Sequence, residues 1–341
     1  MKKRFILMGL LSLLALASCK NDSNNESVSN VDTYEHITLD KGEVELKEAI
    51  AKVEDANVYI SFTKSLTISY AQSAVIYKKV SNTYYVLTHY DSDEFKNTCT
   101  VHVGDDKYTG TLKSYDTYNE LALFTFQTSK SLKTATIKDN VVSSEMVFTL
   151  SVDAGEYYTN TGLSSDDIGL LNTGIISFAG VRECIHTALF SNDNLGSGLY
   201  DYDGNLLGIN VRKQESSGDS KSWGFNYAIY GSALTAIISD LESSSGSIQR
   251  IALNGLRYYT TYKIDDNKSD DKYIVIEVII PAGGFSLLSG DFIFSVDGKN
   301  IESIDSLVDA CYLKKSSESV TLGIYRNNII YYVDNHGNVT N

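Results

Sequence analysis

Short apolar runs rich in Val, Ile, Tyr, Phe and Thr alternate with clusters of Asn, Asp, Gly and Ser along the central part of the chain, as far as about Tyr230. Runs of this length and composition are typical of β-strands joined by turns. Before them, Glu43–Val53 places Val44, Ala49 and Ile50 toward one side and predicts a short amphipathic helix. The folded part of the chain is therefore expected to begin with a helix and to continue as a mostly β protein.

The predicted strands fall into two series. The first holds six strands within roughly seventy residues, a density typical of a small closed barrel. These strands are Val58–Phe62, Ala74–Lys78, Tyr84–Thr88, Thr98–Val103, Tyr108–Lys113 and Leu121–Phe126. The second series is Met146–Val152, Gly174–Phe178, Glu183–Ala188, Leu206–Arg212 and Trp223–Tyr227. After them, the composition of Leu241–Gly246, LESSSG, predicts a linker over residues 241–249, and a different pattern begins at Gln249.

Residues 1–19 carry the features of an export signal. A basic Met1–Arg4 precedes an apolar run, Phe5–Ala17, that is too short to span a bilayer. The run leads into Leu16-Ala17-Ser18-Cys19, which resembles a bacterial lipobox and implies that Cys19 is lipidated after cleavage. The alternative is an ordinary secretory signal with an incidental cysteine. Residues 20–42 are then a flexible tether, so the mature protein is expected to be exported and lipid-anchored to the bacterial cell membrane on its extracytoplasmic side.

The formal net charge of −14 argues against nucleic acid as a general partner, because binding it requires a positive surface. Apart from Cys19, the cysteines are Cys99, Cys184 and Cys311, with no CxxC pair and no histidines at metal-ligand spacing. Three cysteines permit one disulfide and one free thiol but demand neither. Cys311 lies in an apolar helical stretch, which predicts a small core residue. Neither a metal nor a cofactor is predicted.

The most informative segment is Phe190–Asn210, FSNDNLGSGLYDYDGNLLGIN. It resembles the Gly-Asn-Ser-Gly-Gly-Pro-Leu-Phe-Asp-x-x-Gly-x-x-(Val/Ile)-Gly-Ile-Asn segment of HtrA-family trypsin-like serine proteases. Counted back from the final Gly-Ile-Asn, Leu195 occupies the position of the nucleophilic serine. An alkyl side chain has no lone pair with which to attack a peptide carbonyl. The resemblance implies a trypsin-like double antiparallel β-barrel over residues 43–240 whose covalent chemistry cannot start.

A second resemblance lies near the C-terminus. Gly290–Lys299, GDFIFSVDGK, is similar to the Gly-Asp-x-Ile-x-x-(Val/Ile)-(Asn/Asp)-Gly signature of bacterial PDZ domains. A predicted helix over Ile304–Ala310 and strands over Ser319–Tyr325 and Asn328–Val333 follow it. A PDZ domain after a trypsin-like domain is the HtrA order. The resemblance therefore covers nearly all of the chain after about Glu43, and it implies an α+β PDZ domain over residues 250–341.

The other two catalytic positions of the family also differ here. Tyr85–Ser92, YVLTHYDS, resembles the segment Val-Leu-Thr-Asn-x-His-Val, which places Asp91 at the histidine position and His89 two residues too early. Tyr115–Leu123, YDTYNELAL, resembles the aspartate segment and places Glu120 at the aspartate position. Asp91 beside Glu120 would put two anions together, and one of them would hold a proton instead of relaying it. The resemblance thus implies a degenerate triad.

The oxyanion position departs from the family pattern as well, because Asp193 replaces the glycine two residues before the nucleophile and adds negative charge there. One alternative keeps catalysis by a shifted register, with Ser197 as nucleophile and His89 as base. That register needs displacements of two separate segments in opposite directions. Another alternative groups Asp91, Glu120 and Asp193 around a hard cation such as calcium, although their spacing has no loop signature.

The PDZ resemblance implies chemistry that needs no triad. Such domains take an extended peptide as an added strand, and backbone amides of the preceding loop receive its terminal carboxylate. The residues that would bind the peptide are Gly255, Leu256, Arg257 and Tyr258 on the loop and strand, and Leu307, Val308 and Cys311 on the helix. Arg257 would add a charge-assisted hydrogen bond, or is instead a solvated strand-end residue. The apolar helix residues have core positions as their alternative.

These features together predict a lipid-anchored HtrA-like pseudoprotease. Its expected role is to bind exposed or C-terminal peptide segments at the cell envelope, as an adaptor, scaffold or regulator. Its expected partners are polypeptides in the PDZ groove and the membrane through Cys19, with an active protease or further copies of itself as candidates. Two alternatives stay open: an active serine endopeptidase of envelope protein quality control that uses Ser197 and His89, and a structural surface lipoprotein.

Overall fold

The computed structural model describes residues 37–66, 68–91, 93, 95–152, 155–158, 168–188, 195–212, 226–251, 257–264, 272–280, 284–301 and 303–341. The chain divides into two compact units, with the boundary between Lys41 and Gly42. Helix α1 covers Ile37–Val53, beginning earlier than predicted, and a 3-10 turn, η1, covers Glu54–Ala56. Within the described ranges, no helix is long and apolar enough to cross a membrane.

The first barrel is a closed antiparallel sheet of six strands in the order β1-β4-β5-β6-β3-β2, and it closes because β1 pairs with β2 as well as with β4. Its strands are β1 (Asn57–Thr63), β2 (Ile68–Val80), β3 (Thr83–His89), β4 (Thr98–Val103), β5 (Asp106–Asp116) and β6 (Leu121–Gln127). Two short strands from later in the chain, β9 (Gly155–Tyr158) and β15 (Gly246–Ile248), pair with β2 and β5. All six predicted strands are confirmed, and β4 has its predicted bounds.

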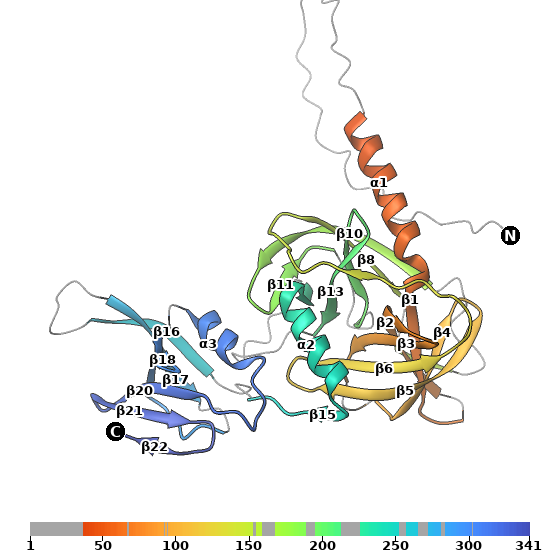
Figure 1. Cartoon of the computed structure of the whole chain (residues 1–341). Coiled ribbons are helices and arrows are strands. Elements are labelled where there is room, and N and C mark those ends of the chain that lie inside the picture. The colour runs from red at the N-terminus through yellow and green to blue at the C-terminus, as the bar shows by residue number, and fades with distance from the viewer. Residues whose placement is uncertain are drawn as a thin grey trace, which may run out of the picture. The chain divides into compact units, whose positions relative to one another are not determined.

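The second barrel has the order β12-β8-β10-β11-β14-β13 and closes through pairing of β12 with β13 (Figure 1). Its strands are β8 (Met146–Val152), β10 (Ile168–Ala179), β11 (Glu183–His186), β12 (Gly198–Asp201), β13 (Asn205–Val211) and β14 (Asn226–Tyr230), and β7 (Thr136–Ile137) adds to β13. The expected double barrel is therefore confirmed. Strand β12 was not predicted, and Trp223–Phe225 of the predicted last strand lie outside the described residues.

Helix α2, Gly231–Ser243, occupies part of the predicted linker. Its buried residues Leu234, Ile237, Ile238 and Leu241 recur at helical spacing, and the helix packs against β5, β6, β13 and β14. Directly after it, β15 continues the first barrel. Within residues 241–249, where composition predicted a linker, the structure has the end of an amphipathic helix and a short strand.

The C-terminal domain is a third sheet with the order β16-β17-β18-β20-β21-β22, and β19 pairs with β18. Its elements are β16 (Arg257–Ile264), β17 (Lys272–Ile280), β18 (Phe292–Val296), β19 (Lys299–Asn300), α3 (Ile304–Cys311), β20 (Thr321–Arg326), β21 (Ile329–Asp334) and β22 (Val339–Thr340). Ser303 caps α3, since its hydroxyl accepts a hydrogen bond from the Ser306 amide. Arg326 donates two hydrogen bonds to the buried Asp291 carboxylate. This PDZ-like sheet and helix agree with the expected α+β domain.

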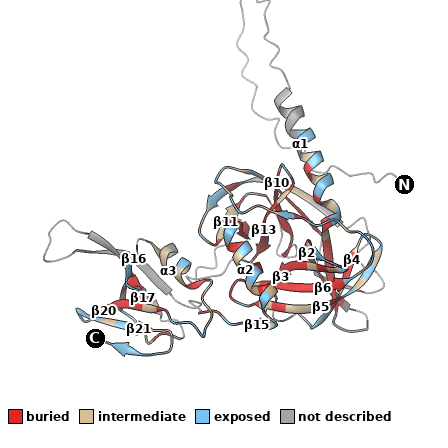
Figure 2. Cartoon of the chain, in the orientation of Figure 1, coloured by how far each residue is buried: buried red, intermediate tan, exposed pale blue. Residues whose placement is uncertain are grey.

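One apolar core is shared by both barrels. It joins Val75 and Leu87 of the first barrel to Phe148 and Ile209 of the second, and Leu234 of α2 packs into it. Figure 2 shows buried residues concentrated along the strands of both barrels. Because apolar burial is the main stabilising contribution to folding, this shared core fixes how the two barrels face each other. The candidate site lies on both sides of that junction.

Cys99, Cys184 and Cys311 are all free and buried. Burial raises the pKa of each of these thiols to about 12. The disulfide that the cysteine count permitted is therefore absent among them, and the prediction that Cys311 is a small core residue is confirmed. Thiols that stay protonated at neutral pH are poor nucleophiles.

Besides His89, which belongs to the candidate site, two histidines are buried in the described residues, one in each barrel. The His102 ring stacks on Tyr59 at 4.1 Å between ring centroids, and its Nε2 is hydrogen-bonded to the Ser61 hydroxyl at 2.8 Å. His186 Nε2 lies 2.9 Å from Asn210 Oδ1. Burial lowers the pKa of each imidazole from 6.5 to about 4. Both rings are therefore neutral at physiological pH and serve packing.

We expect this burial to make folding sensitive to mild acid. Between pH 6.5 and pH 4 the unfolded chain binds protons that the folded histidines do not, so stability falls as the pH drops. Each histidine should lower the free energy of unfolding by about 2 kcal/mol between pH 7.5 and pH 5. Urea unfolding at both pH values should show a smaller loss in His102→Gln than in the unsubstituted chain. An identical loss in both would contradict the assignment.

Candidate functional site

The nucleophile position lies in a turn at the start of β12. Leu195 is 1% exposed, so its side chain is buried in the protein interior. The Gly196 amide donates to the Asn210 carbonyl at 2.8 Å, and the Asn210 amide donates to the Ser197 carbonyl at 2.9 Å. These two bonds hold the nucleophile segment against β13. The position predicted to lack a nucleophile is thus an ordered, buried leucine.

Gly196 adopts a positive φ of 85°, which side-chain-bearing residues rarely adopt. A Cβ at this position would overlap the Ser73 carbonyl oxygen and the Thr88 hydroxyl, and it would crowd the His89 amide. The turn therefore passes directly against β2 and β3 of the first barrel. Glycine is required here both by backbone conformation and by the close approach of the other barrel.

Ser197, the alternative nucleophile, has no exposed surface. Its Oγ accepts a hydrogen bond from Asn210 Nδ2 at 2.8 Å, and the other end of the Asn210 amide meets His186. Ser197 thus belongs to a buried polar chain inside the second barrel. His89 contacts Glu120 instead. In the structure, the alternative nucleophile Ser197 and the alternative base His89 therefore have separate partners.

His89, and not Asp91, faces the carboxylate at the aspartate position. His89 Nε2 lies 3.2 Å from Glu120 Oε2, with the histidine 1% and the glutamate 22% exposed. The Tyr90 amide donates to the Glu120 carbonyl at 2.7 Å, which ties the two segments together. Asp91 instead accepts from Arg212 Nη2 at 3.3 Å. Asp91 and Glu120 were expected to be adjacent anions. In the structure each has its own partner, His89 for Glu120 and Arg212 for Asp91.

The turn that carries Glu120 is built around Asp116. The Asp116 carboxylate accepts hydrogen bonds from the Tyr118 and Asn119 amides and from Asn119 Nδ2, at 2.9 to 3.1 Å. Arg250 Nε donates to it at 2.8 Å, and both side chains are fully buried. Arg250 also pairs with Asp240 at 2.7 Å. Neither Asp116 nor Arg250 was singled out from the sequence, because their 134-residue separation leaves no local signal.

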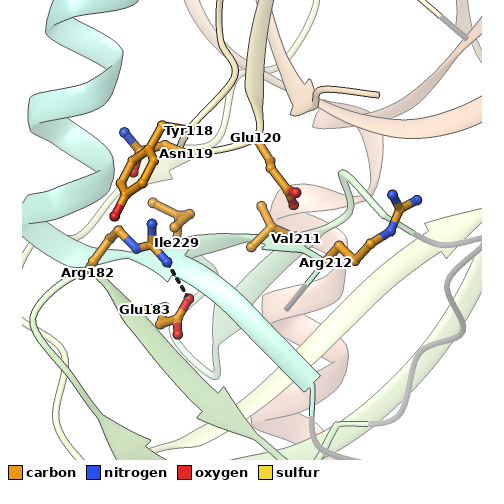
Figure 3. Close-up of a pocket in the computed structure, with 8 residues that line it drawn as sticks. All are labelled: Tyr118, Asn119, Glu120, Arg182, Glu183, Val211, Arg212 and Ile229. Atoms are coloured by element: carbon orange, nitrogen blue, oxygen red, sulfur yellow. Dashed lines mark hydrogen bonds and ion pairs between the residues drawn. The ribbon is translucent and has the colours of Figure 1, made fainter. Parts of the chain in front are cut away.

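A small pocket lies beside Glu120 (Figure 3). It is lined by Tyr118, Asn119, Glu120, Arg182, Glu183, Val211, Arg212 and Ile229. Within it, Arg182 donates to Glu183 at 3.0 Å, and the guanidinium lies over the Tyr118 ring, 5.3 Å from its centroid. Glu120 and Arg212 flank Val211 in the view of Figure 3. The pocket therefore combines two carboxylates, two guanidinium groups and an apolar floor.

No group of three or more His, Cys, Asp or Glu side chains in the described ranges is arranged to hold a metal ion. Two residues of the calcium alternative, Asp91 and Glu120, have the partners given above. The third, Asp193, lies outside the described residues, as do Cys19 and the loop residues Gly255 and Leu256. The oxyanion, lipidation and carboxylate-loop assignments therefore stay predictions.

The predicted peptide-binding residues of the C-terminal domain have different surroundings. Arg257 and Tyr258 begin β16, the strand expected to receive a peptide. Leu307 and Cys311 are fully buried in the core of that domain. Val308 is partly buried against a cluster that contains Tyr118 of the first barrel. Leu307 and Cys311 therefore have the core positions that were their alternative, while peptide binding by Arg257, Tyr258 and Val308 stays a prediction.

Sequence relatives were found among curated proteins, although no family model matches the chain. The Serine protease Do-like HtrA of Lactococcus lactis subsp. lactis (strain IL1403) is 25% identical over 291 residues, which cover 78% of this chain and 70% of the relative. That of Lactobacillus helveticus is 26% identical over 273 residues, which cover 75% of this chain and 65% of the relative.

Solved structures share the fold. The HtrA-type protease AlgW with tripeptide matches with a TM-score of 0.58 and 19% sequence identity, covering 86% of this chain and 96% of the solved chain. At this identity the likeness is one of fold. It extends over the barrels and the C-terminal domain, in agreement with the domain order read from the motifs.

The close approach at Gly196 can be measured against a matched glycine. Gly246 has nearly the same φ, 82°, but a Cβ added to it would meet no atom within 4 Å. Gly246→Ala should cost about 1 kcal/mol of unfolding free energy from backbone strain alone. Gly196→Ala should cost about 1 to 3 kcal/mol more, because a methyl group would push β2 and β3 away. Urea unfolding of both variants tests this, and equal losses would show that the two barrels do not meet at Gly196.

Proposed function

This chain belongs to the HtrA-like family of trypsin-like serine proteases, and we propose that it is a lipid-anchored pseudoprotease that binds exposed or C-terminal peptide segments at the cell envelope. One observation supports the proposal: Leu195, the residue that the motif register places at the nucleophile position, is buried. Acyl transfer needs a group that can attack the carbonyl, and a hydrocarbon cannot. The fold persists without the atom on which the family's chemistry depends.

The geometry around that position supports the same proposal. In a working site, the imidazole bridges the nucleophile and a buried carboxylate. Here His89 is paired with Glu120, while the only hydroxyl of the segment within two residues, Ser197, is paired with Asn210. The alternative of an active endopeptidase would keep the His89–Glu120 pair but requires Ser197 to leave Asn210 and reach the imidazole. No specific contact among the described residues favours that rearrangement.

Peptide binding is supported by the C-terminal domain. Strand β16 pairs with β17 and with no other described strand, so it lies at the edge of the described sheet, the kind of strand to which a peptide can add. Solved neighbours include the HtrA-type protease AlgW with a tripeptide and with a decapeptide. For this chain we propose β-strand addition along β16, with the terminal carboxylate at residues 255–258. Lipid anchoring rests on the lipobox-like segment that ends in Cys19.

The binding mode can be tested on the soluble chain starting at Lys20. Fluorescence anisotropy should show that peptides with a free C-terminal carboxylate bind about tenfold more tightly than their amidated forms. Arg257→Ala should weaken only the free-acid peptides, and Lys263→Ala, which removes a positive charge at the other end of β16, should leave them unchanged. Equal binding of both peptide forms would contradict carboxylate recognition. Failure of a broad peptide library to bind would favour a structural lipoprotein.

The loss of catalysis can be tested by restoring residues. We expect the double variant Leu195→Ser, Asp91→His to hydrolyse unfolded casein no faster than background, because Asp193 still stands at the oxyanion position. His89 would also keep its pairing with Glu120, leaving the new imidazole without a carboxylate. Robust hydrolysis by the double variant would show that the rest of the site is intact. Hydrolysis by the unsubstituted chain that Ser197→Ala abolishes would establish the active alternative.

A further inference from the structure

We infer that the C-terminal domain positions Glu120 against His89, with Asn119 and Arg250 as the positioning residues. The histidine–carboxylate pair is then held together only while that domain is docked on the first barrel. This positioning goes beyond the proposed peptide binding and does not depend on it. The starting observation is the backbone of Glu120, the last residue of the turn between β5 and β6.

Glu120 has an unusual backbone conformation. Its φ is 51°, in the left-handed region that residues with a long side chain rarely adopt. Such a conformation persists only where the surrounding contacts impose it. Figure 3 shows the Tyr118 and Asn119 side chains on one side of the turn and the Glu120 side chain pointing away from them. The contacts of Tyr118 and Asn119 therefore govern where the Glu120 carboxylate lies.

The C-terminal domain supplies those contacts at the end of α3. Asn119 is 1% exposed, and its Nδ2 donates to the Tyr312 backbone carbonyl at 3.1 Å as well as to the Asp116 carboxylate. The Tyr118 ring lies in one apolar cluster with Tyr312 and Val308. A buried amide needs its hydrogen-bond partners, because losing them leaves its desolvation uncompensated. One side of the turn is therefore bound by the C-terminal domain.

Arg250 makes a second link, from the segment that joins the two domains. Its Nε donates to the Asp116 carboxylate at 2.8 Å, and both side chains are 0% exposed. Its Nη1 donates to the Leu313 carbonyl, and the backbone of residues 249–251 pairs with that of residues 314–316. A guanidinium is always charged, so in the interior it depends on these fixed acceptors. Arg250 therefore ties the carboxylate that organises the turn to the chain after α3.

The histidine segment holds the turn from the opposite side. The Tyr90 amide donates to the Glu120 carbonyl at 2.7 Å, and His89 Nε2 lies 3.2 Å from Glu120 Oε2. When α3 leaves the barrel, Asn119 loses its carbonyl partner, and the contact that imposes the left-handed conformation is gone. Glu120 then relaxes and leaves His89, while β3 keeps its own pairing with β2 and β6. The pair is thus incomplete without the C-terminal domain.

Amide hydrogen exchange tests this positioning on the soluble chain used for peptide binding. The Tyr90 amide reports on the turn, because it is bonded to the Glu120 carbonyl. Val308→Lys places a charge in the apolar cluster at the end of α3, and since Val308 is only partly buried, the core of the C-terminal domain stays intact. NMR should show the Tyr90 amide exchanging about tenfold faster in this variant. The Val86 amide, in the middle of β3, should keep its rate.

A second variant and a matched control accompany this measurement. Arg250→Lys keeps a positive charge beside the buried Asp116 carboxylate, but a single ammonium cannot also reach the backbone carbonyl that the guanidinium bonds. It should accelerate Tyr90 exchange by about three- to tenfold. Asp309→Lys places a lysine on the exposed neighbour of Val308 in the same helix and should leave Tyr90 exchange unchanged. Urea unfolding checks that each variant folds.

Unchanged Tyr90 exchange in both Val308→Lys and Arg250→Lys would overturn the inference. Equal acceleration of Tyr90 and Val86 would overturn it as well, because docking would then support the fold as a whole and not the turn. If one of the two variants fails to fold, the other decides. If both fail while Asp309→Lys folds, docking is a requirement of folding and the positioning role is wrong. Peptide binding along β16 takes no part in these measurements, so failure of the proposed function is distinguishable from failure of this positioning.

Discussion

The site depends on the contact in which the turn at Gly196 presses against β2 and β3. There is no room for a Cβ between this turn and the Ser73 carbonyl or the Thr88 hydroxyl, so the two barrels meet backbone to backbone. The shared core behind the turn, which joins side chains of both barrels, holds them at that distance. The nucleophile segment and the histidine segment sit on opposite sides of this contact, and the Asp91–Arg212 pair joins the same two barrels.

The residues that the motif register places at the family's catalytic positions lie beside this junction. Leu195 extends the apolar interior up to the turn, and a buried polar chain from His186 through Asn210 to Ser197 satisfies the groups beneath it. Beside the turn, Asp91 is paired with Arg212 and Glu120 is paired with His89. Breaking the Arg250–Asp116 pair would strand a charge in the interior, because both side chains are fully buried, whereas Arg212 is half-exposed and can return to water if its pair with Asp91 breaks.

Much of the fold could be predicted from local pattern, because alternating apolar runs and motif spacing are encoded over a few residues. Strand β4 and strand β8 have their predicted bounds. Strand β12 was missed since four residues, GLYD, carry too little periodicity. Helix α2 was missed because the serine-rich composition of its C-terminal end indicated a linker. The apolar residues Leu234, Ile237, Ile238 and Leu241 nevertheless have helical spacing.

The site was predictable only in part. The motif register that places Leu195 at the nucleophile position comes from one segment, because the glycines after Leu195 match the family pattern. The partners of His89 and Asp91 could not be predicted, since a motif gives a residue's position along the chain and not the direction of its side chain. Arg212 is 121 residues from Asp91, and Arg250 is 134 residues from Asp116. Such pairs are set by the packing of the barrels, which no local pattern encodes.

The central claim is that no activated nucleophile exists in this site, and covalent labelling addresses it most directly. The soluble chain beginning after Cys19 would be treated with a fluorophosphonate that reacts with activated serines, beside an active HtrA protease, and its intact mass measured. The structure predicts no adduct on this chain when the control is fully labelled. A stoichiometric adduct that maps to Ser197 would contradict the account, because that hydroxyl would then have left Asn210 and found a base.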